Sequence, residues 1–303
     1  MRERYVLLGL AHPRAAWFRS VGQWATGAML PAEFVRCVSL EELRVRLRSG
    51  RPFSAVVVDG TLPGVDRDVI AEAVEVGVSA VVVDDGHRDW RQLGAAAVLP
   101  SSFDRDQLVE VLAATSRPVG AATVETTVSG HLPTVEPAPL IAVTGTGGTG
   151  ASTVAIALAQ GLATREPMRP TVATTPRRSD PGRNRVLLAD LCRTADQAML
   201  HDSRVLVPGI QEVVEAHRTG EPAPTSLQEQ TFEVPLRGYR LLLGLRRARH
   251  WVALRPRALA SALDGLQRAF DVVVADVEPD VEGEVETGSV DVEDRNLLAR
   301  TAL

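Results

Sequence analysis

Residues 141–153 read IAVTGTGGTGAST, an apolar run that breaks into glycines and continues as the helical pattern VAIALAQGLA. Glycines let successive backbone N–H groups converge on one point, and a helix N-terminus adds unpaired donors and a positive dipole end. The spacing between the first and last glycine is that of a GxxxxG phosphate loop. It predicts a nucleotide site formed by Gly145, Thr146, Gly147, Gly148, Thr149, Gly150, Ala151, Ser152 and Thr153. The alternative is a tight strand-to-helix turn in which glycine serves packing alone.

A lysine is missing from this loop. Ala151 stands where the phosphate-loop pattern has lysine, and the whole chain contains no lysine. In phosphate-loop enzymes that cation counts most as charge builds in the transition state. We therefore expect weak binding of ATP or ADP by backbone donors, with hydrolysis weak or lost. Ser152 is placed to offer its hydroxyl to Mg²⁺.

The glycine loop opens an α/β pattern that continues to the end of the chain. Apolar runs that predict strands alternate with helical stretches, at residues 140–145, 185–191, 239–245 and 271–277. This alternation is typical of a parallel, doubly wound sheet. The last stretch, NLLARTAL, has a helical pattern with no strand after it. Residues 165–184 are expected to be an exposed insertion, and the strongly acidic stretch 276–295 is expected to be mobile.

The first 115 residues repeat the same alternation. Five strands are predicted, at residues 5–10, 34–39, 54–60, 79–85 and 96–101. Ser39 followed by Glu42 predicts a capping box for the second helix. Residues 116–138 are rich in Pro, Gly, Thr and Val without a period, which is typical of a linker. The predicted organisation is two doubly wound α/β domains, 1–115 and 139–303, joined by the linker 116–138.

Composition limits the functional classes. The 303 residues carry a formal net charge of -5, which argues against wholesale coating of nucleic acid. Cys37 and Cys192 lie far apart in apolar segments, so reduced thiols and a cytoplasmic location are expected. No stretch approaches the ~18–20 apolar residues of a membrane span, so no transmembrane segment is expected.

Three segments of the second domain resemble the MinD/ParA family of ATPases. TGGTGAST is similar to that family's deviant Walker A motif, KGGxGK[ST][ST], with Thr146 and Ala151 at its two lysine positions. RVLLADL is similar to the family's second strand, with Asp190 at the first acidic position and Cys192 where a second aspartate is common. DVVVADVEPD is similar to its Walker B strand, with Asp276 at the Mg²⁺-associated position. Family members continue past that strand with further strand–helix units, so the resemblance implies that this domain, which ends in NLLARTAL, is shortened at its C-terminal end.

The resemblance implies roles and partners. Ser152 and Asp276 would hold Mg²⁺, and Asp190 would orient water. Within the family, the TadZ/CpaE branch and its septum site-determining proteins are the most similar, because there such a domain follows a receiver-like domain. This implies a homodimeric spatial regulator of septum placement or of Tad-type pilus or secretion assembly. Its partners would belong to those machineries and recruit it to the pole, the septum or the inner membrane face.

The first domain resembles a response-regulator receiver that has lost its chemistry. Asp59 ends the third strand, where a receiver carries its phosphoacceptor. The acidic pair expected after the first strand is replaced by Leu10, Ala11 and His12, and the lysine expected after the fifth by Leu99 and Pro100. Asp84 replaces the hydroxyl expected after the fourth strand. A pseudo-receiver used for dimerisation or docking is therefore the favoured interpretation.

The segment GYRLLLGLRRARHWVALRPRAL includes the predicted strand at 239–245 and is rich in arginine. It contains Arg240, Arg246, Arg247, Arg249, Arg255 and Arg257. A solvated basic loop is the simplest interpretation. Alternatively, Arg246, Arg247 and Arg249 could contact an anion or a partner. Two further functions then stay open: a slow ATPase whose cations are arginines supplied in trans, and a ParA-like protein that binds DNA nonspecifically, which is not favoured.

Overall fold

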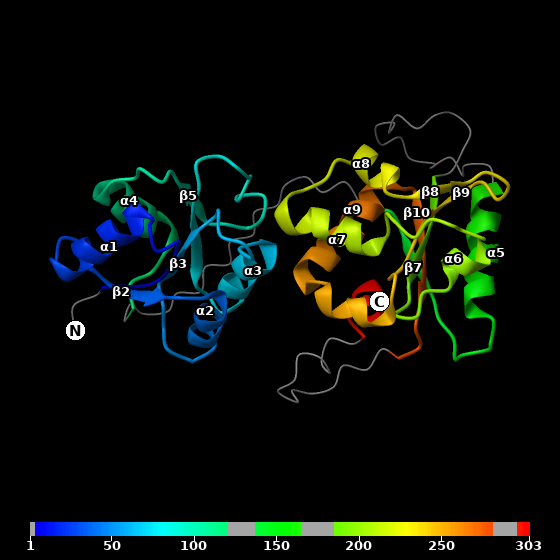
Figure 1. The fold of residues 1–303 in the computed structure, drawn as a ribbon, viewed down its shortest axis with the longest axis horizontal. Helices are drawn as coiled ribbons and strands as arrows, with labels where there is room; N and C mark the ends of the chain where they lie inside the picture. The colour runs from blue at the N-terminus through cyan, green and yellow to red at the C-terminus, as the bar shows by residue number, and fades with distance from the viewer. Residues whose placement is uncertain (1–3, 120–136, 165–184, 281–295) are drawn as a thin grey trace, which may run out of the picture. The chain divides into compact units, whose positions relative to one another are not determined.

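The computed structural model describes residues 4–119, 137–164, 185–280 and 296–303. The chain divides into two compact units, the first formed by residues 1–130 and the second by most of residues 131–303. Each unit holds one five-stranded sheet with helices on both faces (Figure 1). The predicted α/β class with two doubly wound sheets is confirmed. Residues 120–136 of the predicted linker and the whole of 165–184 lie outside the described residues.

The first unit is a parallel sheet in the order β2-β1-β3-β4-β5. This 2-1-3-4-5 order is that of flavodoxin-like doubly wound folds, in which ligands bind beyond the carboxyl ends of the strands. Its elements are β1 (Tyr5–Leu10), α1 (Ala16–Thr26), β2 (Ala32–Cys37), α2 (Leu40–Leu47), β3 (Ala55–Asp59), α3 (Arg67–Glu75), β4 (Ser79–Val83), β5 (Ala97–Leu99) and α4 (Arg105–Thr115).

Strand periodicity builds the two cores of this unit. Alternate residues of a strand point to opposite faces, so Val56 and Val58 of β3 pack with α2 and α3, while Val57 packs with α1 and α4. The connection from β4 to β5 contains no helix, and its Trp90 and Leu93 join the α2/α3 core instead. Trp90 is completely buried, so this loop is fixed by its own side chains.

The predicted capping box of α2 forms with a shift of one residue. The Ser39 hydroxyl accepts from the backbone N–H of Glu42 at 3.2 Å, as expected. The Glu42 carboxylate, however, accepts from the N–H of Val38 at 2.8 Å rather than from that of Ser39. A complete capping box occurs at α4, where Asp104 and Gln107 satisfy each other's backbone N–H groups.

The second unit has the strand order β6-β10-β7-β9-β8. All neighbours are parallel except β8, which pairs antiparallel with β9 at the sheet edge. The elements are β6 (Leu140–Val143), α5 (Ala151–Thr164), β7 (Val186–Leu191), α6 (Gln197–Leu200), α7 (Ile210–Thr219), α8 (Pro224–Glu229), β8 (Phe232–Val234), β9 (Tyr239–Leu242), the 3₁₀ helix η1 (Ala248–Ala253), α9 (Pro256–Ala269), β10 (Val272–Val277) and α11 (Leu297–Ala302). The predicted strand 239–245 therefore ends at Leu242, and β8 was not predicted.

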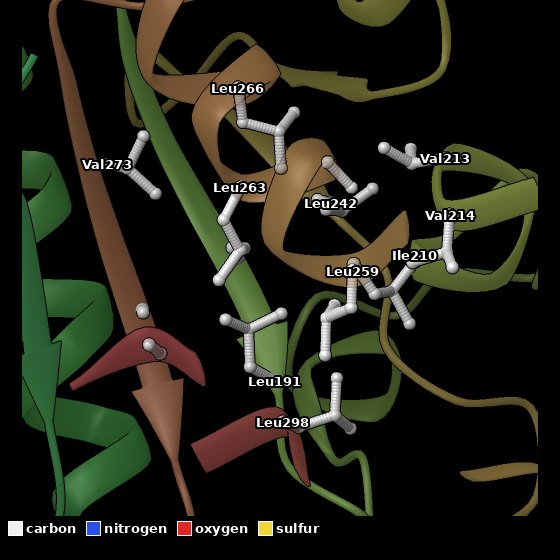
Figure 2. Packing of buried hydrophobic residues seen from close by; sticks show 14 of the residues in the cluster. Leu191, Ile210, Val213, Val214, Leu242, Leu259, Leu263, Leu266, Val273 and Leu298 are labelled. Carbon is white, nitrogen blue, oxygen red and sulfur yellow. The ribbon is translucent and has the colours of Figure 1, made fainter. Parts of the chain in front are cut away.

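Helices cover both faces of the second sheet. Figure 1 shows α5 on one face and α7 with α9 on the other. On the α9 face, Leu259, Leu263 and Leu266 recur at helical spacing and join Leu242 and Val273 in one buried cluster (Figure 2). The predicted C-terminal helix is α11, which packs against α9 and β10.

The strand that precedes the glycine loop is exposed along one edge. β6 pairs only with β10 among the described strands, and all of its residues are half-buried. Within the described parts of the chain, no helix is both long and apolar enough to cross a bilayer.

Candidate functional site

The glycine loop lies between the end of β6 at Val143 and the start of α5 at Ala151. Gly148 and Gly150 have φ angles of +83° and +85°, a region that glycine adopts without the strain of a side chain. A Cβ added at either glycine, or at Gly147, would meet no atom within 4 Å. The loop backbone is therefore open to a ligand at the N-terminus of a 14-residue helix.

Hydrogen bonds within the loop hold its backbone in this conformation. The backbone N–H and hydroxyl of Thr149 both donate to the carbonyl of Thr146, at 3.1 and 2.7 Å. The N–H of Val154 donates to the carbonyl of Gly150 at 2.9 Å, which begins the helix. Most of the predicted phosphate contacts are exposed. These are Thr146, Gly147, Gly148, Thr149, Gly150 and Thr153, whereas Gly145, Ala151 and Ser152 are half-buried.

Two aspartates lie side by side on the central strands. Asp190 of β7 and Asp276 of β10 are direct partners in the parallel register. Each aspartate lies two residues after a side chain that packs with α5, namely Leu188 in β7 and Val274 in β10. Because alternate residues of a strand point to the same face, both aspartates face the α5 side of the sheet. Asp190 is 0% exposed and Asp276 is 2% exposed. The structure thus brings together two acids that are 86 positions apart only because parallel strands end at the same edge.

Gln197, at the start of α6, ties this pair together. Its backbone N–H donates to Oδ2 of Asp190 at 2.9 Å, and its Nε2 donates to Oδ2 of Asp276 at 2.7 Å. The same Nε2 lies 3.5 Å from the backbone oxygen of Ser152 in α5. The N–H of Cys192 donates to the other Asp190 oxygen at 3.2 Å. Gln197 is itself completely buried, so it covers the carboxylates on the side of the glycine loop.

Burial changes the protonation of this cluster. Loss of hydration raises the pKa of Asp190 to about 7, assisted by the charge of Asp276 and opposed by the two backbone hydrogen bonds from Gln197 and Cys192. Burial, followed by the charges of Asp190, Asp276 and Glu278, raises the pKa of the Cys192 thiol. Cys192 is therefore a thiol at neutral pH and not a nucleophile.

The predicted cofactor ligands fit in part. The glycine loop suits a phosphate, because it offers backbone donors in open space. For Mg²⁺, Asp276 is an oxygen ligand of the preferred type, but its Oδ2 accepts from Gln197 in this structure. Ser152 and Asp276 would act together only after that amide moves. The water-orienting role of Asp190 stays a prediction, since both of its oxygens accept from backbone N–H groups.

Sequence reasoning missed Gln197. It follows Asp190 by seven residues in a short helix that has no strong periodicity. Glutamine is mostly an exposed residue, so nothing local marks this one as buried. Its position depends on the tertiary contact between α6 and the two central strands.

The arginines separate into different environments. Arg240 lies within β9 and donates to the hydroxyl of Thr231 at 2.7 Å and to the carbonyl of Gln228 at 2.9 Å. It is structural, so its inclusion in an exposed basic segment was wrong. Arg246 donates to Gln211 and forms an ion pair with Glu212 at 3.1 Å. Its guanidinium is therefore already engaged with these two side chains.

Arg247 and Arg249 are exposed at the start of η1, and no ion pair links either of them to another described residue. A cavity of about 280 Å³ lies beyond the carboxyl end of β9, and neither arginine lines it. Ala198, Met199 and Leu206 line it with Gly244 and Arg246. Gly244 also backs the acidic cluster, because a Cβ there would lie 2.8 Å from Cγ of Asp190.

In the first unit, the receiver-like site is filled. Asp59 is buried, and its Oδ1 accepts from the N–H and hydroxyl of Thr61 at 3.0 and 2.6 Å. The indole of Trp90 packs on Gly60, where a Cβ would lie 2.8 Å from Nε1, and that Nε1 donates to Asp84 at 3.0 Å. Burial alone would raise the pKa of Asp84, but hydrogen bonds from His87, Trp90 and the backbone lower it.

The receiver-like site also lacks a ligand set for a metal. Within the described part of this unit, the acids, histidines and cysteines form no group close enough to hold an ion. Asp59 is thus a strand-end aspartate surrounded by packing and local hydrogen bonds, which fits the expected pseudo-receiver.

Comparison with known proteins gave structural neighbours for each unit. No protein-family model and no curated protein sequence matches the chain. A ParA family ATPase from Chlorobium tepidum TLS is similar over 48% of this chain and 53% of its own, at 15% identity and a TM-score of 0.38. The cell division ATPase MinD of Pyrococcus furiosus is similar over 52% and 56%, at 18% identity and a TM-score of 0.34. FixJ-N is similar over 37% of this chain and 93% of its own, at 13% identity and a TM-score of 0.31.

The chain spans about half the length of the two ATPases that it matches. Identities of 13 to 18% concern the fold and not the activity.

Proposed function

We propose that the chain is a MinD-like spatial regulator whose second unit binds ATP or ADP through the backbone of residues 145–150 and turns it over slowly or not at all. The observation that carries this proposal is the exposed loop before α5, with Gly148 and Gly150 at positive φ and open space above them. Converging N–H groups at a helix N-terminus recognise a phosphate irrespective of its attached base.

Binding without efficient turnover follows from the charges. Ala151 supplies no cation to the β- and γ-phosphates, and no other position of the chain is a lysine. The acids expected to serve Mg²⁺ and water are buried beneath Gln197. Backbone donors stabilise a ground-state diphosphate, but the extra charge of a phosphoryl-transfer transition state needs a cation that is in place.

Bound Mg²⁺ would neutralise phosphate charge at this site. Ser152, through its hydroxyl, and Asp276, through the carboxylate on β10, are the residues that would hold it. Movement of the Gln197 amide away from Asp276 would uncover that ligand. Nucleotide binding could thereby be coupled to the position of α6.

The cellular role proposed is placement of the division septum or of a Tad-type pilus or secretion apparatus, by a homodimer that docks on those machineries. The resemblance of the glycine loop and the strand-end aspartates to MinD-type proteins supports this role. The pseudo-receiver would supply a docking or dimerisation surface, because Trp90 packs on Gly60 beside the expected phosphoacceptor Asp59, whose Oδ1 accepts from Thr61.

A fluorescent fusion in the native cell tests this role. The wild-type fusion should gather at the pole or septum. Gly148→Val, which places a branched side chain at a φ of +83°, should disperse it. Gly161→Ala, in an open position of α5, should behave as wild type. Circular dichroism of both purified variants separates loss of the site from loss of fold. A uniformly distributed wild-type protein would contradict the proposal.

A slow ATPase with arginines supplied in trans is the second candidate. The exposed positions of Arg247 and Arg249 favour it, since neither makes an ion pair with another described residue. Replacing both with alanine should then lower the hydrolysis rate, whereas Arg204→Ala, at another exposed site, should not. An unchanged rate would exclude this version. DNA binding by the same arginines would instead give an affinity that falls steeply with salt.

A further inference from the structure

Asp190 and Asp276, the buried aspartates of the second unit, have no basic partner among the residues that the structure describes. Asp190 and Asp276 are 0% and 2% exposed and are adjacent in the strand register. Their hydrogen-bond donors among the described residues are the N–H of Cys192 and the backbone and amide of Gln197, and no arginine or histidine is among them. Buried charges in proteins are paired or coordinate metals. The pair therefore needs a proton or a cation that the surrounding described residues do not supply.

Two further donor atoms converge on the same place. One oxygen from each aspartate and the Sγ of Cys192 all lie within 4.8 Å of one another. The amide end of Gln197 is also there, with its Nε2 2.7 Å from Asp276. Its Oε1 is buried without a hydrogen-bond partner, although an amide oxygen is a strong acceptor. A bound cation would give that oxygen a partner.

We propose that Asp190, Cys192, Asp276 and the Oε1 of Gln197 form a site for one divalent cation of borderline softness, Zn²⁺ by choice, which binds without nucleotide. A thiolate among the ligands selects Zn²⁺ over Mg²⁺ and Ca²⁺, which prefer oxygen alone. Four protein ligands complete the tetrahedron of a closed, structural zinc site. The proposal does not depend on the proposed nucleotide function.

The spacing allows such a site with a small contraction. Zinc–ligand bonds of ~2.0–2.3 Å place the donors of a tetrahedron about 3.3–3.8 Å apart. The observed limit of 4.8 Å must therefore close by up to about 1.5 Å. Rotating the Gln197 amide by half a turn exchanges Nε2 with Oε1, which would turn the oxygen toward Asp276. The backbone N–H groups that hold Asp190 then orient a ligand, as outer hydrogen bonds do in metal sites.

An entry side is also present. Cys192 is only partly buried, so it is the most accessible of the four proposed ligands, the others being Asp190, Asp276 and Gln197. The carboxylate of Glu278 lies on this side, where it accepts from the N–H of Thr194 at 3.0 Å. Its negative charge would attract a cation toward the thiol.

Metal titration of the full-length chain tests the site. Protein stripped with a chelator is titrated with Co²⁺, as a spectroscopic probe, and with Zn²⁺. One equivalent should bind, a thiolate-to-cobalt charge-transfer absorption should appear, and excess Zn²⁺ should raise the Tm by roughly 5–10 °C. Cys192→Ser should abolish the absorption and weaken Zn²⁺ binding at least ~100-fold. This loss exceeds the ~10–100-fold typical of removing a residue that only hydrogen-bonds a metal ligand. Cys37→Ser, which removes the buried cysteine of the first unit, should keep both.

Three results would overturn the site. They are the absence of stoichiometric Zn²⁺ binding by the folded wild-type chain, a charge-transfer band that survives in Cys192→Ser, and binding confined to Mg²⁺. The first would mean that the two aspartates share a proton instead of a metal. Because the wild-type titration alone gives this answer, a variant that fails to fold does not decide the question.

Discussion

Removing the carboxyl of Asp190 should abolish its contribution to the pH dependence of the stability of the second unit. The pKa of this group is raised to about 7 in the folded chain, chiefly by burial. A folded-state pKa above the unfolded value means that the native state binds the proton more tightly. The stabilisation is then complete below the unfolded pKa and is lost as the pH rises through the folded pKa. Asp190→Asn removes this titration and keeps the side-chain shape.

The size of the effect follows from the shift. Between 3.8 and about 7 lie about 3 pKa units, which correspond to up to about 4 kcal/mol in the free energy of unfolding. The substitution also carries a fixed cost of about 1–3 kcal/mol, because the new amide nitrogen opposes one of the two backbone N–H donors. Asp190→Asn should therefore be less stable than wild type near pH 5 and equal or more stable near pH 8.

Urea unfolding of the metal-free chain at a series of pH values measures this difference. A chelator is needed because a bound cation would give the opposite sign, with stability lost at low pH as protons displace it. Asp264→Asn, which removes an exposed carboxyl from α9, controls for the change in net charge. Parallel stability curves for wild type and Asp190→Asn across this range would refute the raised pKa.

Three further predictions concern the loop, the packing and the first unit. Ala151→Lys should raise the ATP affinity at least ~10-fold in titration calorimetry, because it adds a charge-assisted contact. Gln160→Lys, on the exposed side of α5, adds the same charge away from the loop and should leave the affinity unchanged. Gly244→Ala should lower the free energy of unfolding by about 1–3 kcal/mol, because the new Cβ lies 2.6 Å from that of Ala195. Gly161→Ala, at an open position within α5, should raise it by about 0.5–1 kcal/mol, and urea unfolding measures both. Acetyl phosphate with Mg²⁺ should leave Asp59 unmodified by mass spectrometry, and a stable phosphoryl adduct would contradict the pseudo-receiver.

The sheets could be predicted because their signals are local. Runs such as AVVVD at 55–59 and VVVADV at 272–277 are apolar apart from one aspartate each and are buried along their whole length, as strands covered on both faces are. The glycine loop is equally local, since strand, glycines and helix are contiguous. Even the approach of Asp190 to Asp276 follows from two parallel strands that end at one edge.

The remaining features depend on contacts between distant segments. β8 has three residues and exists only through its pairing with β9. Arg240 and Arg247 belong to one arginine-rich stretch, yet the first lies in a strand against Thr231 and the second in an exposed turn. Gln197 shows the same limit most clearly, because its burial depends on α6 folding over both central strands.

The central claim is that the loop at residues 145–150 binds a nucleotide phosphate without effective turnover. Calorimetric titration of the full-length chain with ATP and ADP, with and without Mg²⁺, tests it most directly when the recovered nucleotide is then analysed for hydrolysis. The account predicts saturable binding, weaker than that of Ala151→Lys, with the ATP recovered intact. Absence of binding at millimolar nucleotide by the folded protein, or rapid conversion of ATP to ADP, would contradict it.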